Sequence, residues 1–195
     1  YIQAAELSYW HKELQKFIEE IFPALPPSER YSEKLWPYLI PFLSDPNSYI
    51  FNTVLVEKPE ADKYLTKEKV DAALRTGLTR FASAYLNGRY KELSKDDILN
   101  KLNYLSYLDG SDLESQMILK IARLFSENKI NEIESLLNMK TMSGLNDASR
   151  GRIENMINSI AGISKESKLK YSISKFEYYN NVVTKLKGEI DRMQK

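Results

Sequence analysis

Apolar residues recur at intervals of three and four along most of this chain, the spacing that places them on one face of an α-helix. The first such segment covers residues 2–22, and three prolines follow it. The longest covers about residues 67–93. The apolar stripe of the first consists of Leu7, Trp10, Leu14, Phe17 and Ile21, and that of the second of Val70, Leu74, Leu78, Phe81 and Tyr85.

Serine residues followed three positions later by an acidic residue are typical of helix N-termini. The pairs are Ser94 with Asp97, Ser111 with Glu114, and Ser174 with Glu177. They predict helices at about 95–107, 112–127 and 175–193. Shorter helices are expected at about 130–138 and 147–160.

Two segments favour strands instead. Residues 49–56 are rich in β-branched and aromatic side chains, and residues 169–173 alternate between apolar and polar. The expected fold class is therefore all-α, a multi-helix bundle with at most one small β-hairpin. Two regions are expected, 1–95 and 96–195, with one continuous domain as the alternative.

Charge is distributed unevenly along a chain whose formal net charge is only +1. Residues 1–140 hold 18 basic and 21 acidic side chains, whereas residues 141–195 hold 10 basic and 6 acidic ones. An excess of cations near the carboxyl end is what a nucleic-acid-binding surface needs. A solvated surface explains the same excess equally simply.

The order of elements after residue 112 matches a winged helix-turn-helix: three helices, a basic turn, a strand and a final helix. In that arrangement the 147–160 helix would read bases and the basic turn would contact phosphates. The candidate nucleic-acid-binding residues are Arg150, Arg152, Asn155, Lys165, Lys168 and Lys170.

Two features of the sequence favour an ordinary helical bundle over the winged helix. The connection at residues 139–145 is longer than the three or four residues that the motif uses. A wing also needs a second strand, and the other candidate strand lies far away at 49–56. Both interpretations remain open at the level of sequence.

The final predicted helix carries apolar residues in the alternating three-and-four pattern of a coiled-coil seam. This pattern predicts an oligomer interface, or else packing onto the chain's own core. The candidate interface residues are Phe176, Tyr179, Val183, Leu186, Ile190 and Met193.

Signals of catalysis are few. The chain has no cysteine and one histidine, His11, and it lacks the glycine-rich phosphate-binding motifs and the nucleophile elbow. No cofactor or metal site is predicted, and no apolar stretch approaches the length of a membrane span. We therefore expect a non-enzymatic, soluble cytoplasmic protein that binds DNA through its basic C-terminal segment. The alternative is an adaptor or scaffold subunit that binds protein partners or forms a homodimer.

Overall fold

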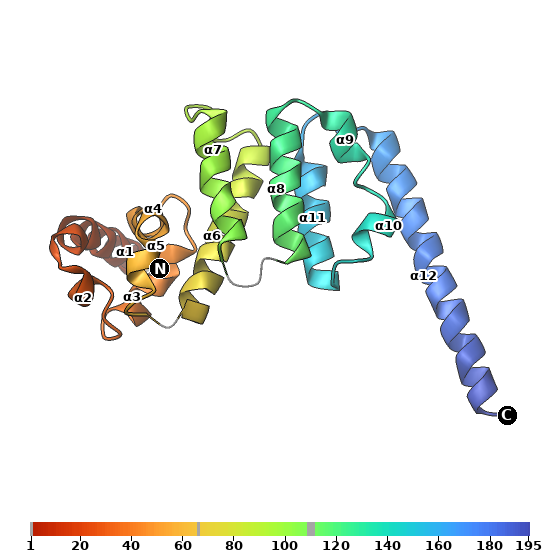
Figure 1. Cartoon of the computed structure of the whole chain (residues 1–195), viewed down its shortest axis with the longest axis horizontal. Helices are drawn as coiled ribbons and strands as arrows, with labels where there is room; N and C mark the ends of the chain where they lie inside the picture. The colour runs from red at the N-terminus through yellow and green to blue at the C-terminus, as the bar shows by residue number, and fades with distance from the viewer. Residues whose placement is uncertain (1, 66, 109–111) are drawn as a thin grey trace. The chain divides into compact units, whose positions relative to one another are not determined.

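The computed structural model describes residues 2–65, 67–108 and 112–195, and within these ranges it contains helices and no strand (Figure 1). The expected all-α fold class is confirmed. Two short 3-10 helices, Phe22–Ala24 and Asn103–Ser106, accompany the α-helices. The α-helices are α1 (Ile2–Ile21), α2 (Pro27–Arg30), α3 (Trp36–Leu43), α4 (Tyr49–Val56), α5 (Lys58–Ala61), α6 (Lys67–Leu86), α7 (Lys95–Leu102), α8 (Leu113–Ser126), α9 (Ile130–Glu134), α10 (Met139–Met142), α11 (Asp147–Ser159) and α12 (Lys165–Met193).

The chain forms two compact units. Unit 1 comprises residues Tyr1–Phe81 and Tyr107–Asp109, and unit 2 comprises Ala82–Ser106 and Gly110–Lys195. The division falls inside α6, earlier in the chain than the boundary at residue 95 that the sequence suggests.

In unit 1, the segment 49–56 is helix α4, so the strand predicted there is wrong. The Ser48 hydroxyl caps this helix by accepting hydrogen bonds from the N–H groups of Ile50 (3.2 Å) and Phe51 (3.4 Å). One side of the helix is fully buried, through Ile50, Phe51, Val54 and Leu55. The N-cap and this one-sided burial outweigh the strand preference of β-branched residues.

Helix α6 approaches α3 and α4 most closely at Gly77. A Cβ atom there would lie 2.5 Å from the Phe51 ring and 2.6 Å from the Leu43 carbonyl oxygen. Only glycine permits this contact. Gly77 therefore allows α6 to pack closely against α3 and α4.

Helix α1 confirms the predicted helix over residues 2–22, but its apolar stripe faces outward. Trp10, Leu14, Phe17 and Ile21 each expose between 37% and 66% of their surface. The opposite side of α1 packs on unit 1, where His11 stacks on Phe42 with ring centroids 5.3 Å apart. The side chain of Leu7 lies outside the described residues.

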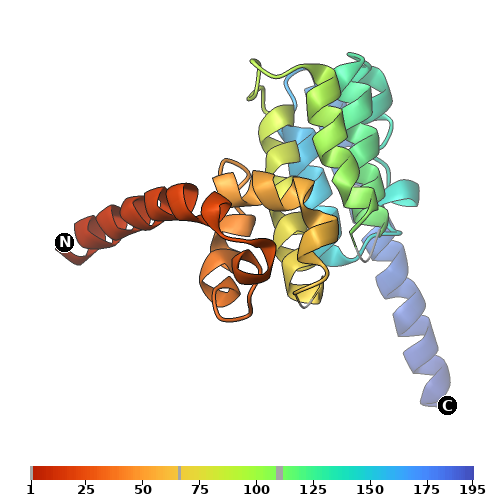
Figure 2. The same ribbon diagram turned by 60° about the vertical axis from the view of Figure 1, so that its left-hand side comes forward.

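Unit 2 is built around α8 and α11, which lie side by side in both views (Figures 1 and 2).

The helix N-caps of unit 2 agree in part with the prediction. The Ser94 hydroxyl accepts a hydrogen bond from the Asp97 N–H at 3.1 Å, as expected. For α8 the cap is Asp112, whose carboxylate accepts from the Ser115 N–H at 2.8 Å. Ser111 lies outside the described residues.

Helix α12 begins ten residues before its predicted start, so the strand predicted at 169–173 is also wrong. The Ser164 hydroxyl caps the helix by accepting from the Ser167 N–H at 3.1 Å. Ser174, the predicted cap, therefore lies within a continuous helix. Glu134 of α9 fixes this start, because its carboxylate accepts from the Ser164 N–H (2.8 Å) and the Ser167 hydroxyl (3.1 Å).

Candidate interaction surface on helix α12

The two arginines predicted to face a ligand make contacts inside unit 2 instead. Arg152 on α11 donates from Nε to Glu114 Oε1 at 2.5 Å and from Nη2 to Oε2 at 2.9 Å, and Glu114 on α8 is 9% exposed. The Ser149 hydroxyl donates to the same carboxylate at 2.7 Å. These hydrogen bonds raise the pKa of Arg152. Arg152 therefore ties α11 to α8.

Arg150 is only 7% exposed, so it cannot lie on an open surface. It pairs with Asp147 one turn earlier and lies 3.8 Å from Glu154 one turn later. Its guanidinium also lies over the Tyr179 ring of α12, 5.5 Å from the centroid. This cation–π contact joins α11 to α12.

The remaining candidate nucleic-acid contacts lie nearer to solvent. Asn155 and Lys165 are exposed. Lys168 donates to the Asn158 carbonyl at 3.2 Å, and Lys170 pairs with Glu166 at 3.0 Å. Of the six candidates, Asn155, Lys165 and Lys170 are exposed, Lys168 is half-buried, and the two arginines pair with acidic side chains of unit 2, Arg150 buried and Arg152 partly exposed.

The described residues give the winged-helix interpretation no confirmation. They include no strand to serve as a wing, and the segment expected to be the wing is the first part of α12. The connection before α11 contains a further helix, α10, instead of a tight turn. The multi-helix bundle is the arrangement that the structure shows.

One side of α12 packs against its own unit. Tyr171 is buried there, and burial together with the nearby charge of Glu154 raises the pKa of its hydroxyl. Lys175 donates to both oxygens of Glu154 on α11, at 3.1 and 2.9 Å. Together with the Arg150–Tyr179 contact, these interactions fix the rotation of α12 about its own axis.

The predicted interface residues follow one another along α12 from Phe176 to Met193, where they form what we call the α12 seam, and one of them, Tyr179, also contacts Arg150. They expose between 38% and 85% of their surface and face solvent in the described structure. The seam consists of Phe176, Tyr179, Val183, Leu186, Ile190 and Met193. Sequence analysis thus identified the residues of this surface, although it left open whether they pack internally.

The seam continues toward the start of α12 through two residues that sequence analysis missed. Leu169 and Ile173 expose 62% and 51% of their surface on the same side of the helix as Phe176. Assigning 169–173 to a strand concealed them. In a helix, Leu169, Phe176, Val183 and Ile190 follow one another at intervals of seven, the coiled-coil repeat.

The apolar side of α12 stays exposed even where the helix is packed against unit 2. Leu169 and Ile173 lie in the same turns as the buried Tyr171. Farther along, both views show the helix running on beyond α8 and α11 (Figures 1 and 2). The seam is therefore exposed along its length, least so at Tyr179, where Arg150 covers part of the ring.

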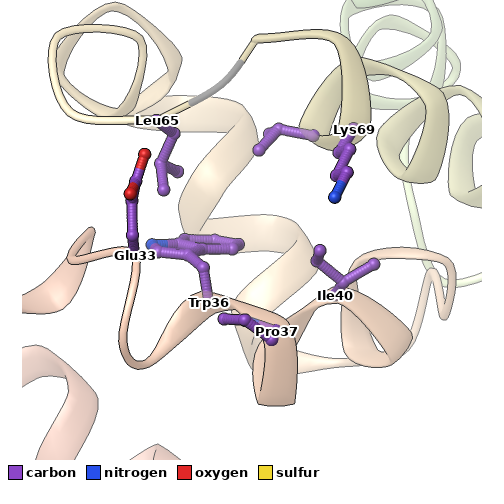
Figure 3. Close-up of a pocket in the computed structure, with 7 residues that line it drawn as sticks. Glu33, Trp36, Pro37, Ile40, Leu65 and Lys69 are labelled. Atoms are coloured by element: carbon purple, nitrogen blue, oxygen red, sulfur yellow. The ribbon is translucent and has the colours of Figure 1, made fainter.

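Unit 1 contains a separate cavity of about 360 Å³ between α3 and the start of α6. Trp36, Pro37 and Ile40 line one side, and Leu65 and Lys69 the other, with Glu33 at the edge (Figure 3). The buried indole N–H of Trp36 has no hydrogen-bond partner among the described residues. The cavity is mainly apolar and offers no catalytic pair of side chains.

Among the described residues, no group of three or more histidine and acidic side chains is placed to hold a metal ion. No helix within the same ranges is long and apolar enough to cross a membrane. Comparison of the chain with protein-family models, curated proteins and solved structures finds no match.

Replacing Arg152 with alanine is expected to destabilise the protein, because it removes two charge-assisted hydrogen bonds from the largely buried Glu114 carboxylate. We expect a loss of about 1–3 kcal/mol in the free energy of unfolding, measured by urea denaturation. The matched control is Lys170→Ala, which removes a cation from an exposed pair and is expected to cost less than about 0.5 kcal/mol. Equal losses in the two variants would show that the Arg152–Glu114 pair does not hold α11 to α8.

Proposed function

We propose that this protein is a non-enzymatic helical interaction subunit that binds a helix of another protein chain through the α12 seam. The observation that carries the proposal is the exposure of α12. Tyr171 and Lys175 pack against the rest of unit 2, while the six large apolar residues of the seam each expose 38% or more of their surface.

Large apolar patches on a folded protein mark surfaces for association, since burying such side chains is favourable by roughly 25 cal/mol per Å². The α12 seam is linear and has the seven-residue repeat of helices that pack against other helices. An amphipathic helix of the partner is therefore the occupant that fits its shape.

The seam also differs in composition from the basic surface at the start of α12. Between residues 176 and 193 the chain has three acidic and three basic residues. A segment with no net charge and six large apolar residues is suited to a protein partner more than to a polyanion.

Position-specific photo-cross-linking tests the proposal. A benzophenone-bearing residue introduced at Leu186 is expected to form one discrete protein adduct in the cells that make the protein, because this position lies in the middle of the seam. The same residue at Asn181, on the other side of the helix, is the matched control and is expected to form none. Adducts are measured by the mass of the cross-linked species after denaturing electrophoresis.

Two different outcomes would contradict binding of a protein helix through the seam. No adduct at Leu186, or the same adducts at both positions, would overturn binding through the seam. Adducts that disappear on nuclease treatment would instead point to the second candidate function.

That second candidate is nucleic-acid binding, which the exposed cations at the start of α12 favour. Lys165, Lys168 and Lys170 lie within its first two turns, and Asn155 is exposed on α11. Arg150 and Arg152 are not part of this candidate surface, because their guanidinium groups are held by acidic side chains of unit 2.

Changing these three lysines together to glutamine tests the second candidate. If they bind phosphates, the affinity for a short labelled DNA or RNA duplex falls, and the slope of log affinity against log salt decreases by up to about 3. Fluorescence anisotropy over a salt series measures both quantities. Lys185→Gln with Lys187→Gln, farther along α12, is the control, and indistinguishable binding by all proteins would exclude this surface.

A further inference from the structure

We infer that the partner of the α12 seam is a second copy of this chain, with the two α12 helices antiparallel over residues 176–193. This inference rests on the proposed function, since it names the occupant of the same surface. Self-complementarity, charge, area and the order of side-chain sizes along the seam support it.

Self-complementarity follows from the spacing of the seam. When two copies run antiparallel about a centre between Val183 and Leu186, each seam residue faces another seam residue. The facing pairs are Phe176 with Met193, Tyr179 with Ile190, and Val183 with Leu186, each occurring twice. A contact that uses the same patch on both partners is what a two-fold symmetric dimer requires.

The order of sizes along the seam favours the antiparallel orientation over the parallel one. Both aromatic residues, Phe176 and Tyr179, lie at the start of the seam, and the aliphatic residues and methionine follow. Antiparallel helices place each aromatic ring opposite a smaller or more flexible side chain, which gives layers of similar volume. Parallel helices would place aromatic against aromatic at one end.

Charge does not oppose self-association. The three acidic and three basic residues between 176 and 193 cancel, so two copies of the segment do not repel each other through net charge. The three lysines of the first two turns, Lys165, Lys168 and Lys170, lie outside the paired region.

The area is sufficient for a specific dimer. A large side chain presents on the order of 150–200 Å² when fully exposed. From the exposed fractions of the six seam residues, each helix offers roughly 500–700 Å² of seam surface. Two copies would bury about 1,000–1,400 Å² in total, above the roughly 1,000 Å² of a specific interface.

Antiparallel pairing has a consequence for what the assembly does. Each α12 contacts α11 as far along as Tyr179, near the start of the paired segment, so the two bodies would lie at its opposite ends. Seventeen residues separate its ends, about 26 Å along a helix axis. The dimer would thus be a spacer that holds two identical bodies apart, with two copies of every other surface available for simultaneous binding.

Cysteine cross-linking tests the partner and its orientation, because the chain has no cysteine of its own. Tyr179→Cys and Ile190→Cys are made separately in the full chain. Mixed under mild oxidation, they are expected to form one disulfide-linked dimer that contains one copy of each variant. Each variant alone is expected to stay uncross-linked, since its two cysteines would be about 16 Å apart along the axis.

Sedimentation velocity supplies the second measurement. The wild-type chain is expected to be a dimer. Val183→Lys with Leu186→Lys is expected to be a monomer of unchanged helix content, whereas the control Asn181→Lys with Thr184→Lys adds the same charge away from the seam and stays dimeric.

The outcomes separate this inference from the proposed function. Cross-linking of each variant with itself would show a parallel dimer and overturn the antiparallel arrangement, while leaving the seam as the binding surface. A monomeric wild-type chain, together with a photo-adduct at Leu186 of a mass other than that of two copies, would overturn the second copy as partner. A monomer with no such adduct would overturn both proposals.

Discussion

The contact between α11 and the first half of α12 is the constraint on which the candidate surface depends. Glu154 accepts two hydrogen bonds from Lys175, and Arg150 lies over the Tyr179 ring. Both contacts hold the first half of α12 against α11. The apolar residues that follow Tyr179 continue beyond these contacts, where they are exposed.

Contacts with buried carboxylates also explain why the predicted basic surface does not include the arginines of α11. Glu114 and Glu154 lie in the interior of unit 2, and burying a carboxylate without a partner is unfavourable. Arg152, Arg150 and Lys175 supply the partners. The cations of α11 are therefore paired with acidic side chains of unit 2, which leaves the lysines at the start of α12 as the candidate basic surface.

Much of the helical architecture could be predicted from local signals in the sequence. The errors of that prediction have local causes as well. The Ser94 cap and the stripes of α1, α6 and α8 are visible in the sequence, because caps and helical periodicity depend on neighbouring residues. The composition of 49–56 and the alternation of 169–173 both favour strands. The structure makes both segments helical, because Ser48 and Ser164 cap the helices that contain them.

The sequence indicates which residues share the candidate surface, but not whether that surface is buried or exposed. Periodicity identifies Phe176, Val183 and Ile190 as one face of a helix without showing whether that face is buried. The pair that decides the role of Arg152 joins residues 38 positions apart, and nothing local in the sequence links them. Leu169 and Ile173 escape the sequence analysis because a strand at 169–173 would be separate from the helix that carries Phe176 and would place Tyr171 on the same side as both of them.

The second half of α12 has a composition that makes an unpaired helix unfavourable. The run Asn180, Asn181, Val182, Val183 and Thr184 consists of residues with low helix propensity, and Gly188 follows one turn later. Most helices in proteins are stabilised mainly by tertiary packing. Beyond Lys175 the described contacts of α12 with the rest of unit 2 are few, so packing adds little to the stability of this segment. Pairing of the seam would supply the missing packing, because it buries Val183 and Leu186 and adds contacts along the whole segment. The proposed pairing would therefore couple helix formation at the end of α12 to association with a partner, and the order of this segment would depend on the concentration of that partner.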